Sequence, residues 1–265
     1  MQKAEGRRFP HSHRLAYCSR HISPQNFLLL SMSDQRKKFK GSPKRYHPKG
    51  ITILYEDYDI IVIEKNHGLL TVETDKEKVN TVDFLLNGYV KKGNPKSRKC
   101  VHVVHRLDRD TSGVLIFAKN AQSKRYLQDN WKKATKTYYA VVHGILEEKQ
   151  GLLSSYLTQN AIYRVYSVED PESGKLSKTE YKVLKESENY SLIEVNLLTG
   201  RKNQIRVHFS EAGHPVVGDK MYGEDDKGIK WLCLHAAKLS INHPVTKERM
   251  TFETKIPAYF NSLLN

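Results

Sequence analysis

The chain has 265 residues, 38% of them apolar, and a formal net charge of +15 from 44 Lys and Arg against 29 Asp and Glu. That length can form one substantial core or two subdomains that share one, and the apolar runs after about residue 50 argue against disorder there. The three cysteines form no CxxC pair and no apolar run approaches membrane length. This excludes a disulfide framework, a zinc site of the usual spacing and a membrane span, and it favours the cytoplasm.

Basic residues gather at the start of the chain. Residues 1–50 contain twelve Lys or Arg and two acids, a net charge of +10. Because residues 1–49 show no sustained periodicity and several Gly and Pro, we predict a flexible basic arm, with one ordered domain spanning 50–265. A basic arm suits RNA, since neutralised phosphates release counterions, but a solubilising extension explains it equally well. Residues 1–31 also have the composition of a transit peptide without its amphipathic repeat, and translation could instead begin at Met32.

The rest of the chain alternates between short apolar strands and helical stretches. In chain order, apolar patterning and turn residues predict two strands, a helix, two strands, a helix, a strand, a hairpin, a helix and two late strands. Their expected ranges are 51–55, 59–64, 80–90, 101–104, 114–118, 121–133, 136–143, 178–185 with 190–197, 200–212, 232–241 and 249–254. Strands and helices are intermixed with many hairpins, which indicates a mixed α/β or α+β domain.

The segment His105–Gly113, between two apolar strands, carries the strongest chemical signal. Taken alone, its Asp-Thr-Ser-Gly sequence is good turn chemistry. Its charges indicate more than a turn, because Asp108 stands between Arg106 and Arg109. A carboxylate near guanidinium groups stays ionised and oriented, as a nucleophile or a base must be.

This nonapeptide resembles the HRLDxxTSG motif of RluA-type RNA pseudouridine synthases at every fixed position. In that family the aspartate of the RLD triplet is the catalytic residue, so the resemblance implies that role for Asp108. Residues 65–70, KNHGLL, resemble an earlier family loop, KPxGLLV, with Asn66 where proline is typical. That exchange loses a rigid φ angle but no chemistry.

Residues 136–144 resemble the family strand KxYxAxVxG, which places the active-site tyrosine at Tyr138. A strand tyrosine is otherwise ordinary core. The stretch 198–219 resembles the block TGRxHQIRVHxxxxGHPIxGD, with Asn203 in place of the usual histidine, so no acid–base role falls there. The arginine of QIR, Arg206, is the implied partner of the catalytic aspartate. A helix over residues 200–212 would have an inward stripe of Ile205, Phe209 and Ala212. Arg201 would lie on that stripe with Ile205 and could pair with the aspartate instead, leaving Arg206 for phosphate.

Residues 232–252 resemble the closing segment of the family. This resemblance implies an apolar wall beside the bound uracil, with Leu234 in van der Waals contact. The candidate catalytic residues are therefore Asp108, Tyr138 and Arg206, and the candidate substrate-binding residues are Arg106, Arg109, Arg201, Gln204 and Leu234. The resemblance implies an α+β fold with a mainly antiparallel mixed sheet, flanking helices and a central cleft.

The implied reaction is isomerisation of uridine to pseudouridine in structured rRNA or tRNA, by a monomer without metal or nucleotide cofactor. No GxGxxG, Walker loop or HExxH sequence is present. The rival interpretation is a non-catalytic RNA-binding or assembly factor that keeps the fold. That factor could lose Asp108, Tyr138 or the arginine pair, whereas all are present here.

Overall fold

The computed structural model describes residues 39–223, 226 and 228–265. Its helices are η1 (Lys44–Tyr46), α1 (Val82–Lys91), α2 (Ala121–Asp129), η2 (Trp131–Lys133), α3 (Gln204–Glu211) and α4 (Ala258–Asn261). Its strands are β1 (Ile51–Glu56), β2 (Ile60–Lys65), β3 (His102–Val103), β4 (Ser112–Ala118), β5 (Thr135–His143), β6 (Gln150–Gln159), β7 (Val165–Val168), β8 (Lys175–Glu186), β9 (Tyr190–Leu197), β10 (Leu234–Asn242) and β11 (Arg249–Glu253).

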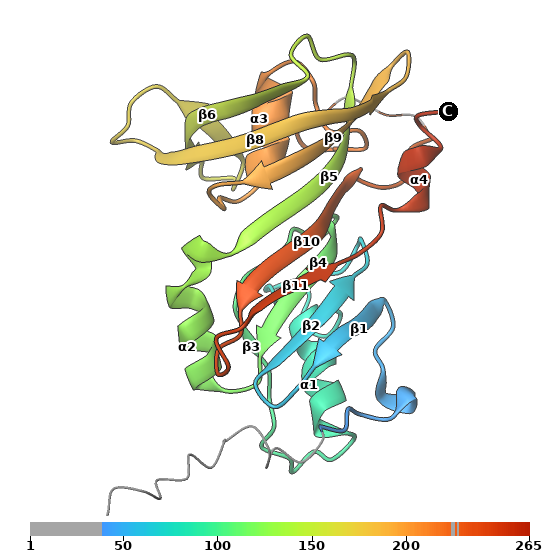
Figure 1. Ribbon diagram of the computed structural model, residues 1–265, viewed down its shortest axis with the longest axis vertical. Helices are drawn as coiled ribbons and strands as arrows, with labels where there is room; N and C mark the ends of the chain where they lie inside the picture. Colours follow the sequence, from blue (N-terminus) through green and yellow to red (C-terminus); the bar gives the residue numbers. More distant parts are fainter. Residues whose placement is uncertain (1–38, 224–225, 227) are drawn as a thin grey trace, which may run out of the picture. The chain divides into compact units, whose positions relative to one another are not determined.

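The strands form one sheet in the order β1-β2-β4-β10-β5-β9-β8-β6-β7, with β11 on β10 and β3 on β4. Every pairing between these strands is antiparallel except that of β4 with β10. The first half, β1-β2-β4, and the second half, β5-β9-β8-β6-β7, therefore meet at β10 (Figure 1). The expected α+β fold with a mainly antiparallel mixed sheet is confirmed.

The β4–β10 junction requires a glycine. Gly113 pairs with Ala236 and has φ +115°, and a Cβ added there would lie 2.1 Å from the Ala236 carbonyl oxygen. Only glycine accepts both this conformation and this close approach. The two halves of the sheet are thus joined directly after the Asp108 segment.

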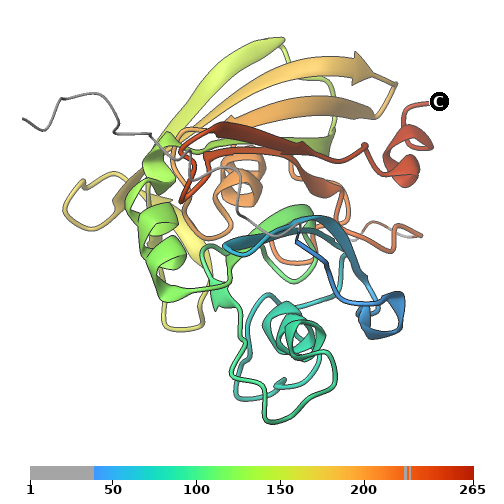
Figure 2. The same ribbon diagram turned by 60° about the horizontal axis from the view of Figure 1, so that its bottom comes forward.

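The first half of the sheet is covered on both faces. Ile61, Ile63, Leu115 and Phe117 pack with α1 on one face, while Ile60, Val62, Val114 and Ile116 pack with Leu127 of α2 on the other. Because both faces are buried, β2 and β4 read as continuous apolar runs rather than alternating ones. Figure 2 shows α1 and α3 on the same side of the curved sheet.

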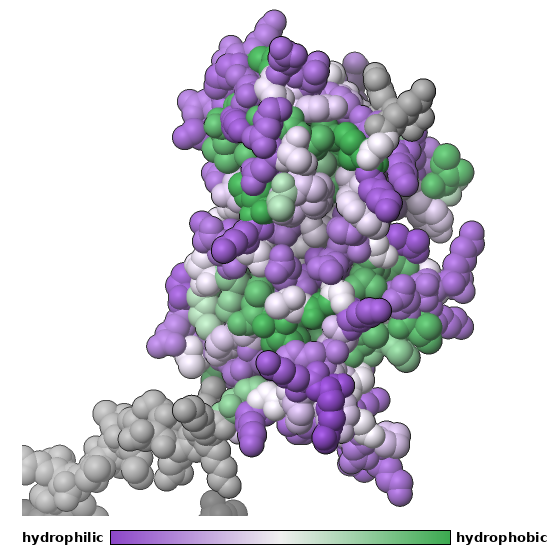
Figure 3. Space-filling view, turned by 90° about the vertical axis from the view of Figure 1, so that its right-hand side faces the viewer, coloured by the Kyte–Doolittle hydropathy of each residue, from purple (hydrophilic) through white to green (hydrophobic). Residues whose placement is uncertain are grey.

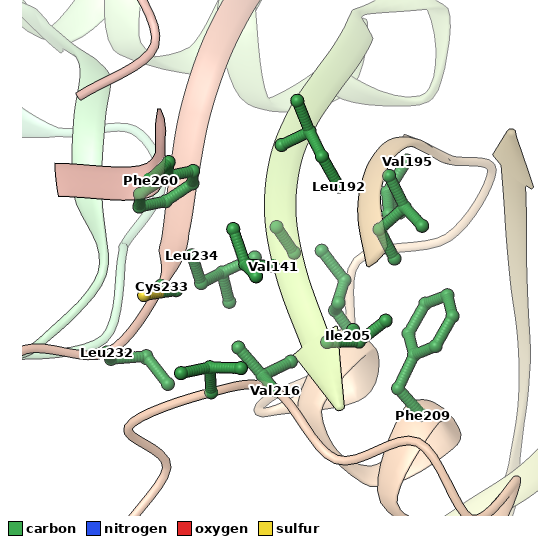
Figure 4. Close-up of a cluster of buried hydrophobic side chains, with 14 of the residues drawn as sticks. Val141, Leu192, Val195, Ile205, Phe209, Val216, Leu232, Cys233, Leu234 and Phe260 are labelled. Atoms are coloured by element: carbon green, nitrogen blue, oxygen red, sulfur yellow. The ribbon is translucent and has the colours of Figure 1, made fainter. Parts of the chain in front are cut away.

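The core of the second half lies between β5, β10, α3 and α4. Figure 4 shows Ile205 and Phe209 of α3 facing Val141, with Phe260 of α4 at the opposite end of the cluster. Ile205 and Phe209 confirm the predicted inward stripe of α3. Ala212, the third predicted member, is exposed, because the helix ends one residue before it.

Strands β6 and β7 were not predicted from the sequence. The inner face of β6 contains Ser155 between Leu153 and Leu157, which weakens the apolar alternation that predicts a strand. Ser155 is accommodated because its hydroxyl lies 3.1 Å from His208 Nε2 on α3. A tertiary hydrogen bond therefore compensates for the polar residue in the inner face.

The part of the predicted arm that the structure describes, residues 39–49, packs on the domain. Ser42 is buried, and its hydroxyl donates to the Tyr89 carbonyl of α1 at 3.0 Å. Phe39 meets Tyr58 edge to face at 5.2 Å between ring centroids. Residues 1–38 of the predicted arm lie outside the described part of the chain.

The molecular face in Figure 3 is mostly hydrophilic, with its hydrophobic residues gathered in separate patches. Among the helices of the described residues, none has the length and apolar character needed to cross a bilayer.

Candidate active site

Asp108 lies in the loop between β3 and β4, with its side chain about one third exposed. The backbone on either side of Asp108 is held by hydrogen bonds to Lys65 of β2 and to Thr71 in the segment that follows β2. Thr71 Oγ1 donates to the Leu107 carbonyl at 2.8 Å and accepts from the Leu107 amide at 3.2 Å. On the other side, Lys65 Nζ donates to the Arg109 carbonyl at 2.9 Å. The loop thus presents Asp108 from a fixed backbone.

Lys65 is fully buried beneath this loop. Its ammonium group donates to three carbonyl oxygens, those of Asn66 at 3.1 Å, Leu69 at 2.9 Å and Arg109 at 2.9 Å. Burial lowers the pKa of Lys65 to about 7, although the charges of Asp110 and Asp108 act in the opposite direction. The sequence resemblance assigned no role to Lys65; a lysine at the end of the apolar strand IIVIEK was the available signal.

Arg206 of α3 is the arginine that pairs with Asp108 in this structure. Its Nη1 lies 3.4 Å from Asp108 Oδ2 and donates to Asn203 Oδ1 at 3.2 Å. Its stronger partner is Asp219, which accepts from Nε at 2.6 Å and from Nη2 at 2.7 Å. Asp219 therefore binds two of the three guanidinium nitrogens, and the third, Nη1, points toward Asp108 and Asn203.

Sequence reasoning assigned no role to Asp219, the last residue of the block 198–219. Its carboxylate is fully buried, and Oδ1 also accepts from the amides of Met221 and Tyr222. Burial disfavours the charged guanidinium of Arg206, but the hydrogen bonds and charge of Asp219, with help from Asp108, raise the pKa of Arg206. Arg206 is therefore a permanent cation, as bidentate arginine–carboxylate pairs are. The feature of the sequence that could have indicated this role is the position of Asp219 directly after the Gly218 turn.

The helix that carries Arg206 starts later than predicted. Asn203 has φ 54° in the left-handed region, and α3 begins at Gln204 rather than at residue 200. Arg201 therefore precedes the helix and is exposed, so the argument that put it on the inner stripe with Ile205 was wrong. Helical spacing applies only within one continuous helix.

Gln204 shapes this loop through hydrogen bonds within the protein. It is buried, its Nε2 donates to the Lys178 carbonyl and to Thr179 Oγ1, and its Oε1 accepts from Thr199 and from the Arg201 amide. All these groups belong to the protein, so Gln204 holds the segment that presents Arg201.

Tyr138 of β5 lies between the two halves of the sheet and packs against the cores of both. Burial, and then the charge of Asp108, raise the pKa of Tyr138 above its usual value. The phenol is therefore neutral at physiological pH and can donate a hydrogen bond. Its pairing with Ala236 places it beside the β4–β10 junction.

Most of the candidate residues named from the sequence line one cleft with a volume of about 900 Å³. It contains seven of the eight candidate residues: Asp108, Tyr138, Arg206, Arg106, Arg201, Gln204 and Leu234. Arg109, the eighth, is exposed and is not among the lining residues, although its carbonyl is held by Lys65. Five cations on the lining make the cleft suitable for a polyanion: Arg106, Lys136, Arg201, Lys202 and Arg206.

Among the described residues, Asp57, Asp59 and His243 form the one group with a spacing that could hold a metal ion. They do not line the cleft. The Asp57 carboxylate already accepts from Tyr55, from His243 and from the amides of Asp59 and Ile60. This group fastens the β1–β2 turn to the end of β10.

Comparison with known proteins gives one consistent family. Residues 59–211 match the sequence profile described as RNA pseudouridylate synthase. An uncharacterised RNA pseudouridine synthase of Bacillus subtilis, YhcT, is 35% identical over 217 residues, which cover 80% of this chain and 71% of the relative. The ribosomal large subunit pseudouridine synthase D of Borreliella burgdorferi is 36% identical over 199 residues, 72% of this chain and 61% of the relative.

The fold is shared with solved structures. Human RNA pseudouridylate synthase domain containing 1 superposes with a TM-score of 0.64 at 26% identity, covering 82% of this chain and 86% of the human one. Human RNA pseudouridylate synthase domain containing 4 superposes with a TM-score of 0.65 at 22% identity, covering 79% and 90%.

Proposed function

The chain belongs to the RNA pseudouridylate synthase family, and from this premise we propose that it converts specific uridines of structured rRNA or tRNA to pseudouridine with Asp108 as the catalytic carboxylate. The observation that carries the assignment is the position of Asp108. It lies in a basic cleft, on a backbone fastened at Leu107 and Arg109, and opposite the permanent cation Arg206.

The reaction requires access to a base that is stacked in folded RNA. The uridine leaves the stack and enters the cleft, because neither its glycosidic bond nor its C6 is reachable within a helix. The C1′–N1 bond then breaks, the uracil turns, and a C1′–C5 bond forms. N1 gains a proton, and the hydrogen on C5 passes to solvent. All heavy atoms of the base are kept and one proton is exchanged for another, so the step needs no oxidant or reductant, and we propose a reaction without nucleotide cofactor or metal.

Each candidate residue has a physical task in this scheme. Asp108 acts as the nucleophile, or as the base on the ribose, and Arg206 Nη1 orients its carboxylate. Tyr138 offers an aromatic face to the uracil and a neutral hydroxyl for proton transfer. Leu234 supplies an apolar contact.

The exposed arginines of the cleft, Arg106 and Arg201, bind phosphates in this proposal. Ribosomal RNA is supported as a substrate by the name of the Borreliella relative. We further propose that the enzyme acts as a monomer in the cytoplasm, where rRNA and tRNA are assembled or used.

The decisive test is Asp108→Asn, compared with Asp110→Asn as a matched control in the same turn. Both changes remove one negative charge, but only Asp108 lines the cleft. We expect Asp108→Asn to abolish tritium release from 5-tritiated uridine in rRNA and tRNA under single-turnover conditions, with RNA affinity near that of the wild type. Asp110→Asn should retain turnover. Appreciable turnover by Asp108→Asn would disprove the assignment of the catalytic residue.

A further inference from the structure

The β6–β7 turn, residues 160–164, carries an unusual pair of exposed side chains. Ile162 is 79% and Tyr163 is 69% exposed, the two highest values among the large apolar side chains of the described residues. Single exposed apolar residues need no explanation, but adjacent ones beside a cleft indicate a contact site. Tyr163 also lines the cleft that contains Asp108.

The turn is held in one shape by Asn160. Its Oδ1 accepts from the amides of Ile162 at 3.2 Å and Arg164 at 2.9 Å, and its amide donates to the Arg164 carbonyl at 3.0 Å. Tyr163 has φ 64°, a left-handed conformation that is unfavourable for a residue with a side chain. The Tyr163 ring is thus presented outside the core from a backbone that the turn constrains.

Lys202 connects this turn to the catalytic side of the cleft. Its ammonium group donates to the Tyr163 carbonyl at 2.9 Å and to Gln159 Oε1 at 3.2 Å, and it lies 5.3 Å from the centroid of the Tyr163 ring. Lys202 precedes Asn203, which bonds to Arg206. An exposed aromatic ring beside an ammonium group is a combination suited to a nucleotide, because the ring stacks on the base and the cation meets the phosphate.

The size of the cleft indicates that it receives more than one base. About 900 Å³ is near the upper end of the range for sites that enclose a whole drug-sized ligand. Removal of one uridine from its stack also leaves the neighbouring bases without a stacking partner. Resting on the function proposed above, we propose that Tyr163 is the stacking platform for a nucleobase that flanks the target uridine, with Lys202 beside the adjoining phosphate.

The test uses rRNA and tRNA stem-loops selected because the wild-type protein binds them, with 2-aminopurine placed on either side of a loop uridine. Stacking on an aromatic ring quenches this fluorophore, so the titration reports both affinity and stacking. The variants are Tyr163→Ala, Tyr163→Gly and Tyr163→Phe in the full-length protein. Tyr166→Ala is the matched control, since Tyr166 is 43% exposed on β7 but does not line the cleft.

We expect Tyr163→Ala and Tyr163→Gly to weaken binding roughly tenfold and to remove the quench at one flanking position, the loss typical of one base–aromatic stack. KM for tritium release should rise by a similar factor, with kcat within about twofold of the wild type. Tyr163→Phe and Tyr166→Ala should behave as the wild type.

Three results would overturn the platform. Tyr163→Ala could match the wild type, Tyr163→Phe could be as defective as Tyr163→Ala, or Tyr163→Gly could retain binding that Tyr163→Ala loses. The last result would assign the effect to the backbone, because glycine keeps φ 64° without strain. A wild-type protein that binds the stem-loops but releases no tritium would refute the proposed function. The quenching of 2-aminopurine fluorescence would still test whether Tyr163 stacks on a base.

Discussion

Two cations lie beside Asp108 and are stabilised differently: Lys65 is buried at the end of β2, in the first half of the sheet, and Arg206 is partly buried on α3, which packs on the second half. Lys65 donates hydrogen bonds to three backbone carbonyls, and burial lowers its pKa to about 7. Arg206, from the second half, meets the fully buried carboxylate of Asp219 through two hydrogen bonds, and its pKa is raised. Carbonyl dipoles compensate a buried charge less well than a carboxylate does.

The difference divides the tasks around Asp108. Lys65 binds the Arg109 carbonyl and so holds the loop, a task that a neutral amine can also perform because it still has N–H donors. Arg206 holds the carboxylate itself, a task that requires a permanent charge. The first half of the sheet therefore positions the Asp108 loop, and α3 on the second half supplies the cation that pairs with the Asp108 carboxylate.

The largest effect is expected from breaking the Arg206–Asp219 pair. Arg206→Met leaves the buried Asp219 carboxylate unpaired and should lower the free energy of unfolding by about 3–5 kcal/mol and abolish turnover. The double variant Arg206→Met/Asp219→Asn has no unpaired buried carboxylate. At least half of the lost free energy of unfolding should therefore return, while turnover stays absent. Urea denaturation of both variants measures this.

Arg201→Ala is the matched control for that experiment. It removes the same side-chain type from an exposed position on the same cleft, so its stability should change by less than about 0.5 kcal/mol. Its RNA affinity should fall. A double variant as unstable as Arg206→Met would show that the pair is not the source of the stability.

A smaller effect is expected from Lys65→Met, which leaves the three carbonyl groups without their donor. We expect a loss of about 3 kcal/mol at pH 9 and slower turnover, because the Asp108 loop loosens. The folded pKa of Lys65 is about 7 and the unfolded one is about 10.4. Between these values the unfolded chain binds more protons, so the stability that Lys65 contributes rises with pH across this window.

The pH dependence separates Lys65 from Arg206. From pH 6.5 to pH 9 the stability of the wild type relative to Lys65→Met should increase by about 2 kcal/mol. The stability of the wild type relative to Arg206→Met should stay nearly constant, because the guanidinium does not titrate there. A constant difference for Lys65→Met would mean that Lys65 keeps its proton, and the contrast between the two cations would fail.

The smallest effect on stability is expected from deleting residues 1–38, the part of the predicted basic arm that lies outside the described residues. We cut at 38 rather than 49 because Ser42 packs against Tyr89. The deletion removes eight Lys or Arg and two acids. It should leave the melting temperature unchanged, weaken RNA binding several-fold and flatten its dependence on salt. Filter binding at several salt concentrations tests this, and an unchanged salt slope would show that the arm does not contact RNA.

The sequence alone was sufficient for the family and the fold class, and it singled out Asp108 and Tyr138, which both line the cleft. The nine-residue motif and the strand pattern depend on residues close together in the chain, and apolar runs identified the buried strands β2 and β4 without tertiary information. These features are local, so a single sequence contains them. The same holds for the Ile205–Phe209 stripe, because a helix brings residues four apart to one face.

Only the tertiary structure decided which groups meet around Asp108. Arg206 reaches Asp108 across 98 positions in the chain and Asp219 across 13. The family resemblance implied the first pair but left Arg201 as an alternative, and it did not indicate the second pair. The late start of α3 depends on the left-handed Asn203 and on hydrogen bonds from Gln204 to β8. Lys65 reads as a surface residue in a sequence, and it is buried because the Asp108 loop folds over it and offers a carbonyl. Such contacts are set by how the two halves of the sheet meet at β10, which residue order along one chain does not reveal.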